Sequence, residues 1–227
     1  INYPDTNWWN AVAKDWATNT EHSLAISGGN EKIFFYSSAQ YMYQDVIYKN
    51  SPQNYNQYQF STNLDAKITK AIKFGFDILG RQTVDNRGVR TTEDLFSYFL
   101  TTSPMSAPYY PNGLLRTGYD GITNNAVLMV SDLPGTSKTT NNTLNLKPKI
   151  RIDLDVITPG LYAEGYAALD YTFNNGKTTN TSYDIYSYDS VSGEYTNQRD
   201  ATGSVSVSSW SSNSSSITPV SYTHLRA

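Results

Sequence analysis

The chain has 227 residues and carries 17 Lys and Arg against 20 Asp and Glu, which gives a formal charge of −3. This balance argues against the basic surface on which nucleic-acid binding depends, and no apolar run reaches the roughly 18 residues of a transmembrane helix. With no cysteine and two histidines, the sequence offers no disulfide framework, no Cys/His metal site and little material for a histidine-based triad. We therefore expect no enzyme, no cofactor and no nucleic-acid partner.

Apolar side chains recur at helical spacing in residues 7–16 and 92–100, so we expect a short helix in each. Asp5 or Thr6 can cap the first helix. Six other segments alternate apolar and polar side chains with the period of two that marks a one-sided β-strand. These segments are residues 22–26, 33–43, 58–68, 72–78, 144–156 and 161–173.

The length of these strands separates two kinds of β-protein. Strands in globular proteins usually run about five or six residues, whereas residues 144–156 and 161–173 keep their alternation much longer. At about 3.3 Å per residue and a tilt near 40°, such a strand rises roughly 33 Å, enough to cross an apolar band of about 25 Å. A small sandwich has no use for that length.

The connections alternate between short and long. Residues 27–30, 69–71 and 157–160 are short and have turn compositions, whereas residues 44–56, 80–143 and 174–200 are long. Membrane barrels have tight turns at one rim and loops at the other. Within 174–200 we expect a small hairpin around Ser192-Gly193, and the serine-rich tract at 204–216 predicts a mobile loop.

These patterns predict an all-β fold, a partial transmembrane antiparallel β-barrel with about six long strands. An aromatic girdle is expected beside the long connections, from Tyr41, Tyr43, Tyr58, Phe60, Tyr171 and Phe173. The side chains expected to face lipid are Phe60, Leu64, Ile68, Phe74, Phe76, Ile150, Ile152, Leu154, Leu161, Leu169, Tyr171 and Phe173. The alternative is a soluble carbohydrate-binding β-sandwich, in which the apolar faces would meet each other.

Several motifs occur in an order typical of one family. Residues 4–10, PDTNWWN, precede HSLAISGGNEK at 22–32; FSTNLDAKITK at 60–70 leads into IKFG at 72–75; and TSP at 102–104 precedes PNG at 111–113. In this order the motifs resemble the SusC/RagA family of TonB-dependent outer-membrane transporters. The resemblance covers residues 1 to about 200.

The resemblance implies a piece of a nutrient importer in the outer membrane of a Gram-negative bacterium, whose whole barrel has about 22 strands. Residues 1–20 would end the plug domain, and residues 21–217 would form the first strands and extracellular loops. Residues 218–227 resemble translated adapter sequence, which would make His224 spurious. The implied partners are a SusD-like surface lipoprotein, the TonB complex acting through a plug region outside this chain, outer-membrane lipid, and an oligosaccharide or peptide substrate.

Four tyrosines are candidates for substrate binding. Tyr109 and Tyr110 stand between two prolines in the longest connection, where they can form a platform for sugar rings or peptide side chains, or pack one loop against another. Tyr162 and Tyr166 lie on the polar side of their strand, where they can line a substrate path or contact the plug. Asp153 and Asp155 share that polar side with basic residues and predict a solvated wall rather than a catalytic pair; His22 predicts a strand entry rather than a metal ligand.

Overall fold

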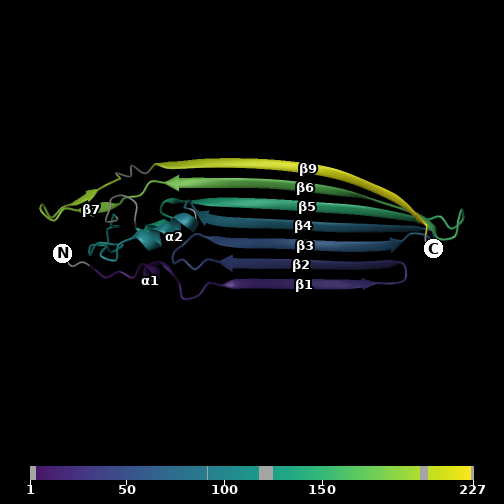
Figure 1. The fold of residues 1–227 in the computed structure, drawn as a ribbon, viewed down its shortest axis with the longest axis horizontal. Coiled ribbons are helices and arrows are strands. Elements are labelled where there is room, and N and C mark those ends of the chain that lie inside the picture. Colours follow the sequence, from purple (N-terminus) through teal and green to yellow (C-terminus); the bar gives the residue numbers. More distant parts are fainter. Residues whose placement is uncertain (1–3, 91, 118–124, 200–203, 226–227) are drawn as a thin grey trace.

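The computed structural model describes residues 4–90, 92–117, 125–199 and 204–225. The helices in these residues are short and the strands of the main sheet are long (Figure 1). The elements are α1 (Trp8–Val12), β1 (Asn19–Gly29), β2 (Ile33–Asp45), β3 (Asn54–Lys67), β4 (Ile72–Gly88), α2 (Thr92–Thr101), α3 (Ala126–Val130), β5 (Gly135–Asp153), β6 (Leu161–Thr181), β7 (Tyr186–Tyr188), β8 (Tyr195–Asn197) and β9 (Val205–Leu225).

Seven strands form one antiparallel sheet in the order β1-β2-β3-β4-β5-β6-β9, and β7 pairs with β8 in a separate hairpin. The short connections lie together at one end of the sheet, which we call the turn rim, and the long connections lie at the other, the loop rim (Figure 1). All six predicted strands are confirmed, and four of them extend well beyond the predicted segments toward the loop rim. The all-β class and the hairpin around Ser192-Gly193 are also confirmed.

The serine-rich tract is not a mobile loop, and that prediction is wrong. It forms β9, which pairs with β6 along its whole length from Val205 opposite Thr181 to Leu225 opposite Leu161. The strand has almost no apolar alternation, because its pairing rests on backbone hydrogen bonds that no side-chain pattern records. Residues 218–225 continue β9, while their assignment to a non-native tail stays a prediction and residues 226–227 lie outside the described residues.

The helices differ in detail from the prediction. The helix expected over residues 7–16 is shorter, because Asn7 rather than Asp5 or Thr6 caps it and Ala13 turns extended to pair with Tyr48. The helix in the long connection matches closely as α2. Helix α3 was not predicted, because four of its five residues are buried and it therefore has no polar face to reveal a period.

The compact core lies at the loop rim rather than against the sheet. It joins α1, α2, α3 and the segments that flank them, and its buried apolar residues are Trp8, Val12, Tyr48, Leu95, Leu115, Ala126, Leu128, Met129, Val130, Tyr183 and Ile185. Trp8 and Val12 tie the N-terminal segment to this core. The Trp8 indole donates to the Ser103 carbonyl oxygen at 3.0 Å, and the Thr6 amide donates to that of Pro104 at 2.8 Å. The assignment of residues 1–20 to a plug domain stays a prediction, with β1 beginning at Asn19.

No helix in the described part of the chain is long and apolar enough to cross a bilayer. The sandwich alternative requires a second sheet over the apolar side chains, and within the described residues the strands β1–β6 and β9 form a single layer. Leu24 and Ile217, which such a sheet would bury, are 69% and 68% exposed. The structure therefore favours a curved wall over a sandwich.

Candidate functional site

The register gives the main sheet two chemically distinct faces. Residues directly opposite each other in neighbouring strands share a face, so the pairing places the even-numbered residues of β1, β3, β4 and β5 with the odd-numbered residues of β2, β6 and β9. We call this side the apolar face and the other the polar face. Within the strands, the charged residues of the apolar face are Asp45, Lys138 and Lys177, all near the loop rim.

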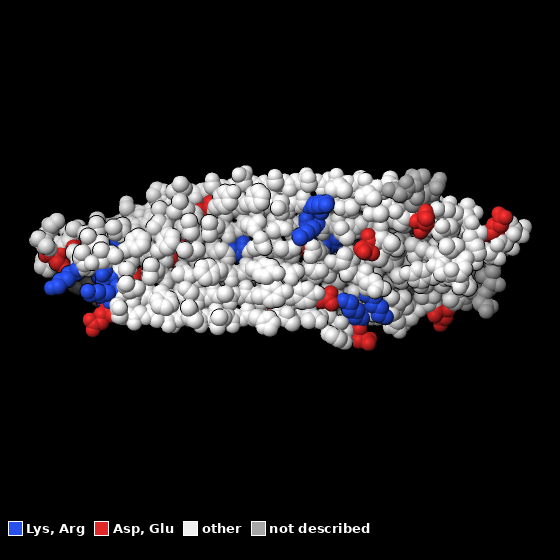
Figure 2. Space-filling view, turned by 180° about the vertical axis from the view of Figure 1, so that it is seen from behind, with Lys and Arg blue, Asp and Glu red and all other residues white. Residues whose placement is uncertain are grey.

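The apolar face is wide and open. Figure 2 shows one side of the molecule with basic and acidic side chains at its left end, more of both in its right half, and mostly uncharged side chains in between. From Thr140 to Ile152 the apolar face of β5 carries no charged residue, a length of about 40 Å along the strand. In water such a surface would be costly to leave uncovered.

Ten of the twelve side chains predicted to face lipid lie on this face, Ile68 and Leu154 lie just beyond the ends of β3 and β5, and contact with lipid stays a prediction. None of the twelve is buried, and among the most exposed of them the exposed fraction runs from 36% at Ile152 to 63% at Ile68. Leu154 lies just beyond β5, where its amide donates to the Leu161 carbonyl oxygen at 2.8 Å.

The aromatic residues expected in a girdle share neighbouring cross-strand rows, but Tyr171 and Phe173 do not end their strand as predicted, because β6 continues to Thr181 and Tyr171 lies at its middle. Tyr41 stands opposite Tyr58 with ring centroids 5.1 Å apart, and His22 stacks on Tyr41 from β1 at 6.4 Å. His22 therefore belongs to an aromatic row. Phe60 and Tyr171 share the next row through Gly80 and Leu144.

The polar face carries a network of ion pairs on β4 and β5. Asp153 accepts from the Lys73 ammonium at 2.8 Å and from the Arg151 guanidinium at 2.9 Å, while Asp77 pairs with Lys149. Asp155 is not part of this network, because it lies in the turn after β5 and accepts the Gly160 amide at 2.7 Å. The pair Asp153 and Asp155 is thus split, and Asp153 is held in ion pairs on the polar face.

Tyr162 and Tyr166 lie on the polar face as expected. The Arg151 guanidinium lies 3.7 Å from the ring centroid of Tyr162, and the Lys147 ammonium 4.2 Å from that of Tyr166. Both rings thus hold cations from the neighbouring strand β5, an attraction that orients the basic side chains along the wall. Whether they contact a substrate or a plug stays a prediction.

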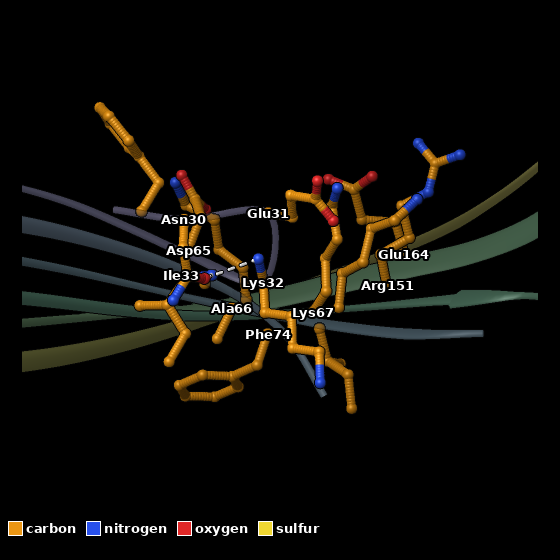
Figure 3. A pocket seen from close by; sticks show the side chains of 15 residues that line it. Asn30, Glu31, Lys32, Ile33, Asp65, Ala66, Lys67, Phe74, Arg151 and Glu164 are labelled. Atoms are coloured by element: carbon orange, nitrogen blue, oxygen red, sulfur yellow. Dashed lines mark hydrogen bonds between the residues drawn. The ribbon is translucent and has the colours of Figure 1, made fainter. Parts of the chain in front are cut away.

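A recess of about 410 Å³ opens at the turn rim (Figure 3). Its lining comes from the turn after β1 and from strands β2 to β6, and it mixes basic side chains such as Lys32 and Lys67 with Glu31, Asp65 and Glu164 and with apolar residues such as Phe74. Its lining holds five basic and three acidic side chains, and three of the basic ones pair with Asp77 or Asp153 outside the lining. The described residues contain no group of His, Cys, Asp or Glu suited to hold a metal ion.

The other two candidate tyrosines lie at the loop rim, in a cleft of about 590 Å³. We call it the tyrosine cleft; it is lined by Pro4, Ala107, Tyr109, Tyr110, Pro111, Arg116, Tyr188 and Tyr195. Tyr110 packs against Tyr195 and Tyr188 of the hairpin β7–β8, with centroids 5.0 and 6.3 Å apart, so it does join one loop to another. Tyr109 is 47% exposed and belongs to the open wall of the cleft.

A tight turn carries Tyr109 and Tyr110. The Gly113 amide donates to the Tyr110 carbonyl oxygen at 2.8 Å, and the Tyr110 amide donates to that of Leu114 at 2.9 Å. Gly113 adopts φ +84°, a conformation that glycine reaches without a Cβ clash. Pro111 and Gly113 thus explain why this segment folds back on itself.

Sequence reasoning missed Arg116, Tyr188 and Tyr195 as parts of this site. They come from two connections separated by β5 and β6, and their meeting depends on a parallel bridge between Arg116 and Tyr186. The sequence does contain one signal for Tyr188 and Tyr195, because residues 183–195 contain four tyrosines.

Comparison with solved structures gives a consistent result. The chain is similar to the RagAB peptide importer in its closed-closed state, with TM-score 0.59, and to the RagAB peptide transporter and the open-open state of the importer, each with TM-score 0.60. Sequence identity is 19% in each case, and the match covers 78% of this chain and 20% of that chain. This likeness is one of fold. No family model matches the chain, and no curated protein matches it either.

Proposed function

We propose that this chain forms part of the wall of a nutrient importer of the SusC/RagA type in the outer membrane of a Gram-negative bacterium. The observation that carries the proposal is the two-faced sheet: an open, nearly uncharged apolar face backs a polar face laced with ion pairs. A wall between lipid and an aqueous interior needs this division. The fold likeness to the RagAB importer, of which the chain spans about a fifth, supports the same reading.

The motifs shared with that family extend the proposal to its partners. The loop rim would face the cell exterior and meet a SusD-like surface lipoprotein, and TonB would act through a plug region. The substrate would be an oligosaccharide or a peptide, and the protein would carry it rather than transform it. Because a seven-stranded sheet with two open edges is too small to close, the chain by itself is expected to show no substrate-specific flux.

Adjacent residues on opposite faces provide the test. The chain has no native cysteine, so Ile150→Cys and Lys149→Cys each place a single thiol on β5, one on the apolar face and one on the polar face. Both variants are labelled with the same environment-sensitive fluorophore, and the protein is reconstituted in liposomes that contain a lipid-attached quencher.

We expect strong quenching at position 150 and weak quenching at position 149. Equal quenching at both positions, or protection of position 150 in protein that stays monodisperse without lipid or detergent, would contradict the membrane wall. The second of these results would instead support a soluble β-protein whose apolar face is covered by protein.

A further inference from the structure

The tyrosine cleft has open aromatic surface that its own packing does not use. Tyr188 and Tyr195 face each other with centroids 5.0 Å apart and hold Tyr110 between the two connections, yet they remain 37% and 38% exposed, and Tyr109 remains 47% exposed. A tyrosine ring presents an apolar face with a hydrogen-bonding tip. The cleft can therefore stack against a flat ligand and bond to its polar rim.

Arg116 adds a positive charge to this aromatic wall. Its guanidinium carbon lies 5.3 Å from the ring centroid of Tyr110, within the range of a cation–π contact. Arg87 and Arg151 each pair with an aspartate, whereas Arg116 forms no ion pair within the described residues. A guanidinium without an ion-pair partner keeps its planar fork of N–H donors available to a carboxylate.

The cleft is held by backbone and buried side-chain contacts. The Tyr186 amide donates to the Leu115 carbonyl oxygen and the Thr117 amide to that of Tyr186, both at 2.9 Å, so the strand segment bearing Arg116 is fixed to the hairpin β7–β8. Buried Asn125 donates to the carbonyl oxygens of Pro108 and Arg116 at 2.7 and 2.9 Å. A ligand would meet a site whose ordering entropy is already lost in folding.

We propose that the tyrosine cleft binds a carboxylate carried beside a flat, weakly polar face. Arg116 would take the carboxylate, and the rings of Tyr109, Tyr188 and Tyr195 would contact the flat face. Two ligands supply this chemistry, a uronic acid sugar and a peptide that ends in an aromatic residue with a free carboxyl group. The binding claim rests on the residues of the cleft, and the further claim that the bound molecule is the imported substrate rests on the proposed function.

The test measures binding to the full chain in detergent micelles by isothermal titration calorimetry. The probes are trigalacturonate with its methyl ester, and a tripeptide ending in phenylalanine with its C-terminal amide. Each pair differs in the carboxylate charge and little else. The variant Arg116→Gln removes the charge from the cleft, and Arg199→Gln is its matched control, because Arg199 stacks on Tyr183 at 4.6 Å outside the cleft lining.

We expect at least one acidic probe to bind, with its neutral partner and the Arg116→Gln protein each about tenfold or more weaker, and with Arg199→Gln unchanged. Binding of trigalacturonate identifies the saccharide, and binding of the peptide identifies the peptide. The inference is overturned if neither acidic probe binds folded protein, if ester and acid bind alike, or if Arg116→Gln leaves binding intact. These measurements need no transport, so their failure is distinct from failure of the quenching test on β5.

Discussion

Asn125, 1% exposed, donates its side-chain amide to the carbonyl oxygen of Arg116 at 2.9 Å. The same amide donates to the carbonyl oxygen of Pro108 at 2.7 Å, and the Asn125 side-chain oxygen accepts from the amides of Val127 and Leu128 at 3.2 and 3.3 Å. One buried side chain thus caps α3 and holds both ends of the segment that carries Tyr109 and Tyr110. The tyrosine cleft depends on it.

Replacing Asn125 by Ala should loosen the loop rim. The change removes the Asn125 partner of the Arg116 carbonyl and of the Val127 and Leu128 amides, at about 1–3 kcal/mol for each group that water cannot reach. The Pro108 carbonyl oxygen keeps the Arg116 amide as a donor at 3.0 Å. We expect hydrogen exchange at the Val127 and Leu128 amides to be more than about tenfold faster, with the strands little affected. Asn112→Ala is the control, since Asn112 is exposed and its side-chain oxygen accepts the amide of nearby Leu114 at 3.1 Å. Equal effects of the two variants would remove Asn125 from its positioning role.

Gly176 and Trp210 stand directly opposite each other on β6 and β9, and their contact tests whether the serine-rich strand is held there. A Cβ on Gly176 would lie 2.2 Å from the indole nitrogen of Trp210, so Gly176→Ala must displace the ring. We expect about 1–3 kcal/mol of lost stability, as for other overpacked sites, read as faster hydrogen exchange along β9.

The double variant Gly176→Ala with Trp210→Ala provides the control, because removal of the indole removes the clash. Added to Trp210→Ala, the change Gly176→Ala should cost little of the exchange protection of β9, whereas added to the unchanged protein it should cost much more. If Gly176→Ala leaves the exchange of β9 unchanged, the tract does not pair with β6 at this point.

The strand Val205–Leu225 also shows where sequence reasoning stops. Segments such as 161–173 can be recognised because their apolar and polar side chains alternate between the two faces of the strand. The serines of β9 have no such asymmetry, and the strand forms because β6 presents a complete row of backbone donors and acceptors to it. A strand held by backbone pairing alone therefore cannot be predicted from the periodicity of its side chains.

The tyrosine cleft was predictable only in part, for a different reason. Tyr109 and Tyr110 could be singled out because the flanking prolines make their segment rigid and local. Arg116, Tyr188 and Tyr195 join them through contacts between two distant connections, which no local period encodes. The faces of the sheet follow from periodicity, whereas the loop-rim site follows from tertiary packing.

Tyr48 should make the loop-rim core sensitive to alkaline pH. Burial raises the pKa of its phenol above the ordinary value of 10.0, because the phenolate loses water on folding. The stability that the neutral phenol contributes is therefore complete below the unfolded pKa and is lost as pH rises toward the folded pKa. Tyr48→Phe, which keeps the ring packed on Phe99 at 5.7 Å, should flatten this alkaline loss in urea unfolding measured from pH 8 to 11. Exposed Tyr109→Phe should retain it, and an unchanged slope in Tyr48→Phe would assign the loss elsewhere.

Asp189 should couple the tyrosine cleft to acid pH. Its carboxylate accepts the Val191 amide at 2.8 Å and the Ser192 hydroxyl at 3.0 Å, and these bonds, the Val191 amide foremost, hold the pKa of Asp189 below the ordinary 3.8. A lowered folded pKa gives stability that is present above the unfolded value and is lost as pH falls through the folded one. The hairpin β7–β8 should therefore loosen below the ordinary carboxyl range.

Because Tyr188 precedes Asp189 directly, this loosening should reach the cleft. We expect the Val191 amide to lose exchange protection, and the Tyr188 ring resonances to shift, as pH falls from 5 to 2.5, while Asp189→Asn shows the loosened signals throughout and no transition. Glu194→Gln serves as the control, since the carbonyl oxygen of Glu194 rather than its side chain accepts the Asp189 amide at 3.0 Å. A transition that persists in Asp189→Asn would show that another carboxyl group governs the hairpin.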